Sequence, residues 1–366
     1  MMNIKGIAIL QGRVLPILLA IFLFACSGKE KPILEKEARE FAKQLQQSIE
    51  KKDGQFMDDA VDRDEIISRA GLKSNSGARE FGAGIRKAAN MGSKIVEAIS
   101  KEGSYELVRI YEKDSKQHMI FRLYSDGSIN YHDMELKRKK GDIKIADIFV
   151  YTSGENLSVT IKGIYDQFAG IIDKSNKTDS WISSLPDIRK KINAGEYQEA
   201  YDIYMNIPEE GRKAKAFRIV KVEICSGLDD EKHQQAIDEL LAAFPDEANM
   251  QLILMDAYFM RKEYDKVMGA INAVDKMINK DPFLDYYRYL CYNVMENPVK
   301  AKEHLLLVTA NYPAFADAQL ELAATYLEEN NPDSAKMVIK NFRQRKSFPQ
   351  SRMDDLLNAY PDFSME

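Results

Sequence analysis

Three stretches of the chain share one pattern at a spacing of 34 residues: YFMRKEYDKV at 258–267, YNVMENPVKA at 292–301 and YLEENNPDSA at 326–335. Each begins with a tyrosine, namely Tyr258, Tyr292 and Tyr326. Each ends nine residues later with a small or short side chain, namely Val267, Ala301 and Ala335. Self-similarity at a fixed period of this length is typical of helical repeat proteins. The pattern therefore predicts helical repeats over residues 183–346.

Two earlier hairpins fit the period less strictly, which brings the prediction to about five helix pairs. The first helices of these pairs are expected near 183–194, 214–227, 247–261, 283–296 and 314–329. The segment 347–366 is expected to supply a capping helix from Ser351 to Tyr360, because an array of repeats needs a polar end. An irregular helical bundle with coincident small residues is the alternative.

The tyrosine followed nine residues later by a small residue resembles the tetratricopeptide repeat. The resemblance implies that one face of the first helices lines a groove for a partner protein, here a protein of the cell envelope. By register, the residues expected on that face are Asp256, Phe259, Tyr286, Asn293 and Leu320, with Phe283 and Asp317 in the same set. Such an apolar groove with scattered acids suits a helix or extended peptide. The alternative is that these side chains pack against neighbouring helices.

Upstream of a polar linker at 173–182, residues 33–172 change from helical to strand-like composition. Amphipathic helices are expected from Leu34 to Ile49 and from Ala78 to Ser100. The apolar face of the first is expected to consist of Leu34, Ala38, Phe41, Ala42, Leu45 and Ile49. Strands are expected at 105–112, 118–124, 129–136 and 143–152, with the last three in an antiparallel meander joined by tight turns. In the last strand, one face is expected to carry Ile143, Ile145, Phe149 and Tyr151. A helix from Ser158 to Ile172 should close this part. The fold class predicted is an α+β domain followed by an all-α array of repeats.

The helices followed by a long sheet, with FRLYSDG at 121–127 and ADIFVY at 146–151, resemble the NTF2-like cone fold. They also resemble the first domain of uncharacterised bacterial proteins that join such a domain to helical repeats. Cone folds of this kind hold ligands or catalytic groups in a pocket, and Tyr131 and Asp147 are the residues expected there. His132 and Asp133 are adjacent on a strand, so they cannot both line one pocket. A small-ligand or enzymatic function at this pocket is the alternative to a binding protein.

Residues 1–25 have the layout of a secretory signal: positive charge at Lys5 and Arg13, then an apolar run that ends LFAC at 23–26. This end resembles the lipobox of bacterial lipoproteins, which implies cleavage before Cys26, acylation of its thiol and attachment to a lipid bilayer. Residues 26–32 then form a tether. Ser27 after the cysteine implies sorting to the outer membrane, on its periplasmic face or at the cell surface.

Removal of the leader takes the formal net charge from −5 to −7, which argues against nucleic acid as a partner. No histidine or cysteine pair has the spacing of zinc ligands, and no cofactor or metal is expected. Cys225 and Cys291 are expected to be free and buried, although an oxidising compartment permits a disulfide between them. The function expected from the sequence is a lipid-anchored, non-enzymatic scaffold of the cell envelope.

Overall fold

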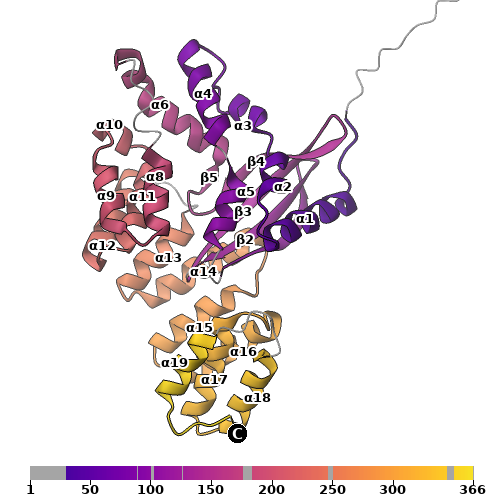
Figure 1. The fold of residues 1–366 in the computed structure, drawn as a ribbon, viewed down its shortest axis with the longest axis vertical. Helices are drawn as coiled ribbons and strands as arrows, with labels where there is room; N and C mark the ends of the chain where they lie inside the picture. Colours follow the sequence, from indigo (N-terminus) through magenta and orange to yellow (C-terminus); the bar gives the residue numbers. More distant parts are fainter. Residues whose placement is uncertain are drawn as a thin grey trace, which may run out of the picture.

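A computed structural model describes residues 30–88, 90–99, 103–125, 127–175, 184–245, 250–343 and 350–365 (Figure 1). It shows a mixed fold: a five-stranded antiparallel sheet with flanking helices, followed by a wholly helical part. We call residues 184–365 the helical array. The predicted α+β part and the helical part that follows it are therefore both present. Cys26, the signal sequence and Trp181 lie outside the described residues, as does most of the predicted linker.

The sheet is a meander in the order β1-β2-β3-β4-β5. Its strands are β1 (Ser104–Lys113), β2 (Lys116–Ser125), β3 (Ser128–Lys139), β4 (Asp142–Val150) and β5 (Glu155–Asn156). Two-residue connections join β1 to β2, β2 to β3 and β3 to β4, and their backbones enter the left-handed region at Asp114, Ser115, Gly127, Lys140 and Gly141. Such turns match the twist of paired strands. The predicted meander is confirmed, and β5 is an addition that the sequence pattern did not indicate.

Six helices surround the sheet in the first part of the chain: α1 (Glu35–Glu50), α2 (Gln55–Ala60), α3 (Arg63–Arg69), α4 (Ser76–Ala88), α5 (Met91–Ala98) and α6 (Leu157–Ser175). They cover one face of the sheet with an apolar core. From α1 this core receives Ala38, Phe41, Ala42, Leu45 and Ile49, all predicted to be on its buried face. Leu34 was expected on that face too but is 64 % exposed, because it precedes the first helical turn.

The single helix expected over 78–100 is wrong, because α4 ends at Ala88 and α5 begins at Met91. The start of α5 is held in place by its contact with α2. The backbone N–H of Gly92 donates to Asp58 Oδ1 at 2.7 Å, and the backbones of Gly54 and Gly92 approach so closely that a Cβ on Gly92 would lie 2.1 Å from the oxygen of Gly54. Only glycine permits this approach. Asp58 thus satisfies the free N–H groups at the start of α5.

The face assignment along β4 is also partly wrong. Ile143, Ile145, Phe149 and Tyr151 were expected on one face, but Ile143 and Ile145 pack with the helices while Phe149 and Tyr151 pack with the array. The ladder between β3 and β4 shifts register between Glu135 and Leu136, so an extra residue enters β4 there. Such a bulge moves every later side chain to the opposite face.

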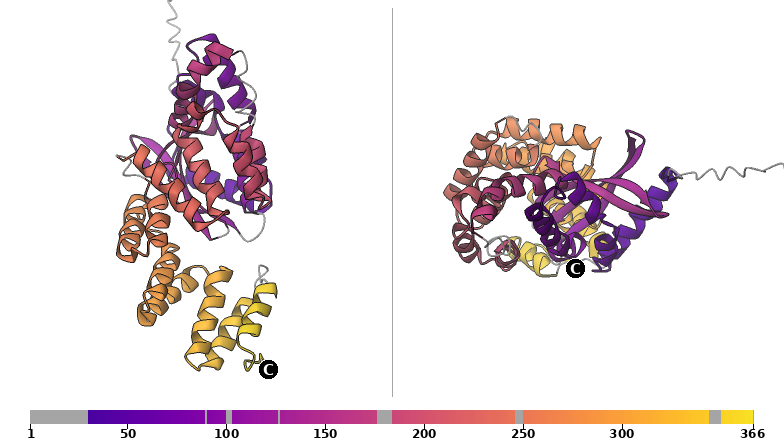
Figure 2. Two further views of the ribbon diagram at one scale, coloured as in Figure 1. Left: turned by 90° about the vertical axis from the view of Figure 1, so that its left-hand side faces the viewer. Right: turned by 90° about the horizontal axis from the view of Figure 1, so that it is seen from above.

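The helical array consists of helix pairs that stack in chain order. Its helices are α8 (Ser184–Asn193), α9 (Tyr197–Met205), α10 (Glu209–Arg212), α11 (Lys215–Ser226), α12 (Asp230–Ala243), α13 (Gln251–Met260), α14 (Tyr264–Ile278), α15 (Leu284–Val294), α16 (Pro298–Asn311), α17 (Ala316–Glu328), α18 (Pro332–Arg343) and α19 (Gln350–Ala359). The first helices of the five predicted pairs occur as α8, α11, α13, α15 and α17. In two perpendicular views the array curves, and in the view from above it bends around the sheet (Figure 2).

The same turn recurs between the helices of several pairs. Lys262, Glu296 and Asn330 lie 34 residues apart and have φ angles of 58°, 54° and 56°. In each turn the next residue donates its N–H to the tyrosine carbonyl five positions before it, at Tyr258, Tyr292 and Tyr326. Gly195 makes the equivalent turn in the first pair, with φ 76°. A left-handed residue that closes a helix with this hydrogen bond is a common C-terminal motif.

The array covers the face of the sheet that the first helices leave open. One core joins Ile120, Tyr131 and Tyr151 of the sheet part to α13, α14 and α15. The sheet is therefore buried on both faces, by its own helices on one side and by the array on the other.

Candidate functional site

The central contact between sheet and array is a buried ion pair. Arg122 lies on β2 and is 1 % exposed, and its guanidinium Nη1 lies 2.6 and 2.8 Å from the two carboxylate oxygens of Asp281, which is 2 % exposed. Asp281 stands in the loop between α14 and α15. A buried charge is tolerated when it is paired, as here, although Nε of Arg122 is buried without a hydrogen-bond partner.

Aromatic side chains complete the surroundings of this ion pair. The guanidinium carbon of Arg122 lies 4.0 Å from the ring centre of Phe283 and 4.7 Å from that of Tyr312. The hydroxyls of Tyr131 and Tyr312 both donate to Asp281, at 3.0 and 2.8 Å. Glu106 also accepts from Arg122. The neighbouring negative charge of Asp281 raises the pKa of Arg122 despite its burial, and burial raises the pKa of Tyr131.

The sheet also occupies positions of the predicted groove. Tyr124 at the end of β2 packs its ring against Phe283 and Phe315, with centroids 5.2 and 5.1 Å away, and its hydroxyl donates to Asp317. The hydroxyl of Tyr287 donates to the backbone oxygen of Gly127 in the β2–β3 turn at 3.0 Å. Phe283 and Asp317, which the repeat register placed in the groove, are therefore in contact with the protein's own sheet.

The five groove residues named from the sequence divide into two groups. Tyr286 is 8 % exposed and packs against Phe315 and Tyr289, while Leu320 is 7 % exposed and packs beneath α18 and α19. Asp256, Phe259 and Asn293 are exposed.

The structure does not bring Tyr131 and Asp147 together. Asp147 lies opposite Glu135 in the ladder, four residues along β3 from Tyr131, which is about 13 Å along an extended strand. Its oxygens accept from the hydroxyl and backbone N–H of Ser158, so Asp147 caps the start of α6. Burial raises its pKa.

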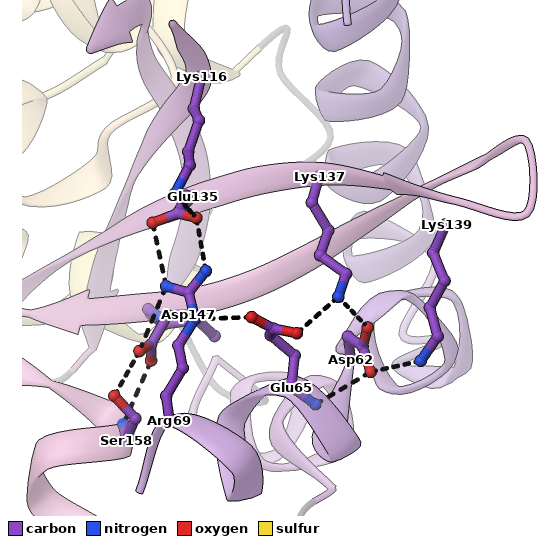
Figure 3. A network of polar contacts seen from close by, with 10 residues as sticks. Asp62, Glu65, Arg69, Lys116, Glu135, Lys137, Lys139, Asp147 and Ser158 are labelled. Carbon is purple, nitrogen blue, oxygen red and sulfur yellow. Dashed lines mark hydrogen bonds and ion pairs between the residues drawn. The ribbon is translucent and has the colours of Figure 1, made fainter. Parts of the chain in front are cut away.

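Asp147 belongs to a charged network on the outer part of the sheet (Figure 3). Arg69 lies between Glu65, Glu135 and Asp147, at 3.0, 2.7 and 3.8 Å. The hydrogen bond from Arg69 lowers the pKa of Glu135 to about 2. Every acid that the figure draws faces a base, so the network stabilises the junction of α3, β3 and α6 rather than offering a free catalytic group.

His132 and Asp133 point to opposite faces, as predicted, and each finds a different partner. Nδ1 of His132 lies 3.0 Å from the hydroxyl of Tyr105 among the helices, and burial lowers the pKa of this histidine to about 4. Asp133 faces the other way and accepts from Tyr111, with His118 Nδ1 at 3.0 Å. Sequence reasoning missed this His118–Asp133 pair. It follows from the β2–β3 register, which pairs Ile120 with Asp133 and so places His118 diagonally on the same face.

The far end of the array carries a second candidate site, which we call the distal hollow. It is a cavity of about 580 Å³ between α16, α17 and α18, lined by Leu306, Thr309, Ala310, Pro313, Gln319, Leu322, Val338, Asn341 and Phe342. Exposed apolar side chains occur on the same helices: Leu306, which lines the cavity, is 42 % exposed, and Leu307 and Met337, each next in sequence to a lining residue, are 44 % and 59 % exposed. Leu306, Leu307 and Met337 were not singled out from the sequence, because they lie on α16 and α18, the second helices of their pairs.

Cys225 and Cys291 are free and buried, as predicted. Among the described residues, no group of three or more potential ligands could hold a metal ion. Within the same part of the chain, no helix combines the length and the apolar character that crossing a bilayer requires.

No protein-family model matches this chain, and a comparison with curated proteins found no match.

Proposed function

We propose that this protein is a lipid-anchored, non-enzymatic scaffold of the bacterial cell envelope, with a tetratricopeptide-like array that binds a partner protein. The distal hollow between α16 and α18 carries this proposal, because it combines a cavity of about 580 Å³ with exposed apolar side chains. Exposed apolar patches of this kind mark interaction surfaces in soluble domains.

Three features support the tetratricopeptide-like assignment of the array. Val267, Ala301 and Ala335 are at most 4 % exposed, as expected if short side chains allow close approach of paired helices. Each tyrosine of the repeat contacts a basic or imidazole group of a neighbouring helix, such as His304, whose ring stacks on that of Tyr292 with centroids 5.4 Å apart. The left-handed turns recur at the same period of 34 residues. The first part of the chain is similarly consistent with an NTF2-like cone, because helices pack against one face of a meander sheet.

Because the sheet contacts part of the predicted groove, we expect the partner to bind farther along the array, toward α19. Tyr124 and Arg122 already occupy the face near α15, at Phe283 and Asp317. The array continues beyond the sheet to α19 (Figure 1). A partner segment with apolar side chains and a polar group able to bond the amide of Asn341 suits the chemistry of the distal hollow.

The alternative function, a ligand or catalytic pocket at Tyr131 and Asp147, has less support. Tyr131 is fully buried against Asp281, and Asp147 is 3 % exposed and bonded to Ser158. Each residue is thus held by a separate structural contact.

Co-purification of the mature chain from envelope extract tests the scaffold. We expect a stoichiometric partner that is retained by the native protein and lost from the double variant Leu306→Asp, Met337→Asp. The matched control is Val159→Asp, which places the same charge on an apolar side chain 50 % exposed on α6. Equal retention by all three proteins, or no stoichiometric partner, would contradict the proposal.

The anchor is tested separately. Metabolic labelling with a fatty acid should label the native chain, and Cys26→Ala should abolish both the label and recovery in the membrane fraction. A labelled Cys26→Ala chain would show that lipid attaches elsewhere.

A further inference from the structure

Glu30 and Lys31, the first residues that the structure describes, are hydrogen-bonded to the hairpin between β3 and β4. The backbone N–H of Lys140 donates to Glu30 Oε1 at 2.6 Å, and Arg138 Nε donates to the backbone oxygen of Lys31 at 3.0 Å. Nη2 of Arg138 also donates to both carboxylate oxygens of Glu37, at 2.8 and 2.9 Å. Hydrogen bonds between charged groups are shorter and stronger than those between neutral groups. The point where the chain enters the fold is therefore set by this hairpin.

The covalent distance from the proposed lipid site to this hairpin is short. Four residue steps separate Cys26 from Glu30. A chain spans at most about 3.6 Å per residue, so the whole reach is about 14 Å. An acylated Cys26 would therefore hold the β3–β4 hairpin close to the headgroups, whatever path the chain takes.

The surface around this entry point suits a bilayer interface. Leu34 is 64 % exposed, and Lys31, Pro32 and Lys140 are exposed beside it. A hollow of about 570 Å³ lies between this segment and the hairpin. Exposed apolar side chains with nearby lysines are typical of interfacial membrane contacts.

Three of the acidic residues here are engaged by other groups, whereas Asp142 of the hairpin is exposed. Glu30 and Glu37 are engaged by the hairpin, and Glu35 is paired with Arg39 at 2.6 Å. Lysine side chains near an anionic lipid surface are attracted to it. The tether keeps the β3–β4 hairpin near the lipid headgroups. Contacts of Leu34, Lys31 and Lys140 with the headgroups then favour one orientation of the protein.

We propose that residues 31–34 and the β3–β4 hairpin form a membrane-facing surface that rests on the lipid headgroups, so that the distal end of the array points away from the bilayer. This orientation rests on the proposed lipid anchor at Cys26. Figure 1 shows the array's last helices at the lower end of the molecule, whereas α1 lies higher up at its side. The distal hollow is then presented to partners at a distance from the membrane.

Depth measurements on coupled vesicles test the orientation without relying on acylation in the cell. The mature chain is joined through the thiol of Cys26 to a maleimide-headgroup lipid in phosphatidylcholine vesicles that contain phosphatidylserine. Cys225 and Cys291 are 1 % exposed, so Cys26 is the thiol that reacts. A fluorescent amino acid replaces Asp142 in one protein and Asp355 in another, both at exposed positions.

A quencher attached to the lipid headgroups should reduce the fluorescence at Asp142 severalfold more than at Asp355. Equal quenching at the two positions, or stronger quenching at Asp355, would overturn the proposal. The double variant Leu34→Ser, Lys140→Glu changes two exposed side chains. It should reduce the difference in quenching between positions 142 and 355. If that difference is unchanged, Leu34 and Lys140 do not orient the protein on the membrane. Because the lipid is attached chemically, this result is independent of whether Cys26 is acylated in the cell, which the fatty-acid labelling decides.

Discussion

Arg122 of β2 and Asp281 of the α14–α15 loop are 159 residues apart in sequence, yet they form a fully buried ion pair at 2.6 Å. Their contact joins the sheet to the array at the point where Phe283, Tyr131 and Tyr312 converge. The two parts of the chain therefore form one structural unit, and its stability depends on a charge pair at their junction.

Removal of one residue of this ion pair should lower the free energy of unfolding. Arg122→Met leaves the carboxylate of Asp281 buried without its cation, and such losses are about 3–5 kcal/mol. Urea unfolding should show this loss, together with recovery of a large part of it in the double variant Arg122→Met, Asp281→Leu. Arg189→Met is the control, because its ion pair with Glu223 is exposed and should contribute less than about 1 kcal/mol. A loss in Arg122→Met no larger than in this control would contradict a buried junction.

The left-handed turns predict stabilising substitutions. Lys262, Glu296 and Asn330 have φ angles near 56°, where a side chain costs about 1 kcal/mol and glycine costs little. Each change to glycine should raise the free energy of unfolding by about 0.5–1 kcal/mol, measured by urea unfolding. Glu303→Gly, at an exposed position inside α16, should lower it by about 1 kcal/mol. Destabilisation by all four changes would show that the turns are not left-handed.

We expect the stability of the fold to depend on pH because His132 is buried. Burial lowers its pKa to about 4, whereas an unfolded chain has a histidine pKa of about 6.5. Because the unfolded chain binds the proton first, stability present above pH 6.5 is lost as the pH falls to about 4, by up to about 3 kcal/mol. His132→Gln should flatten the stability profile in this window.

Tyr105→Phe is the control for that experiment. It removes the hydroxyl 3.0 Å from His132 Nδ1 but leaves the imidazole buried, so the profile should keep its slope. A native profile that is flat between pH 6.5 and 4 would contradict the buried position of His132.

The features that local pattern encodes could be predicted from the sequence. The meander follows from strands of suitable length around short turns at Gly127 and Gly141, and the helix pairs follow from tyrosines and small residues in register. The turns at Lys262 and Glu296 do not use glycine, so no residue type marked them. Helices α2 and α3 are too short for a periodic apolar face to be recognised.

The site depended on contacts that local pattern does not encode. Nothing near Arg122 indicates Asp281, because the pair forms only when the array folds onto the sheet. The repeat register placed Phe283 and Asp317 in the predicted groove, but it could not show that Tyr124 of the sheet would contact both of them. The bulge in β4 separated Ile145 from Phe149 for the same reason.

Photo-crosslinking in intact cells tests the scaffold proposal most directly. A photoreactive amino acid replaces Leu307 or Met337 beside the distal hollow, and Lys73, exposed between α3 and α4, serves as the control position. The account predicts one discrete protein adduct from Leu307 and from Met337, none from Lys73, and loss of the adduct when Cys26→Ala releases the chain from the membrane. No adduct at the hollow, or the same adduct from Lys73, would contradict a partner held at the distal end of the array.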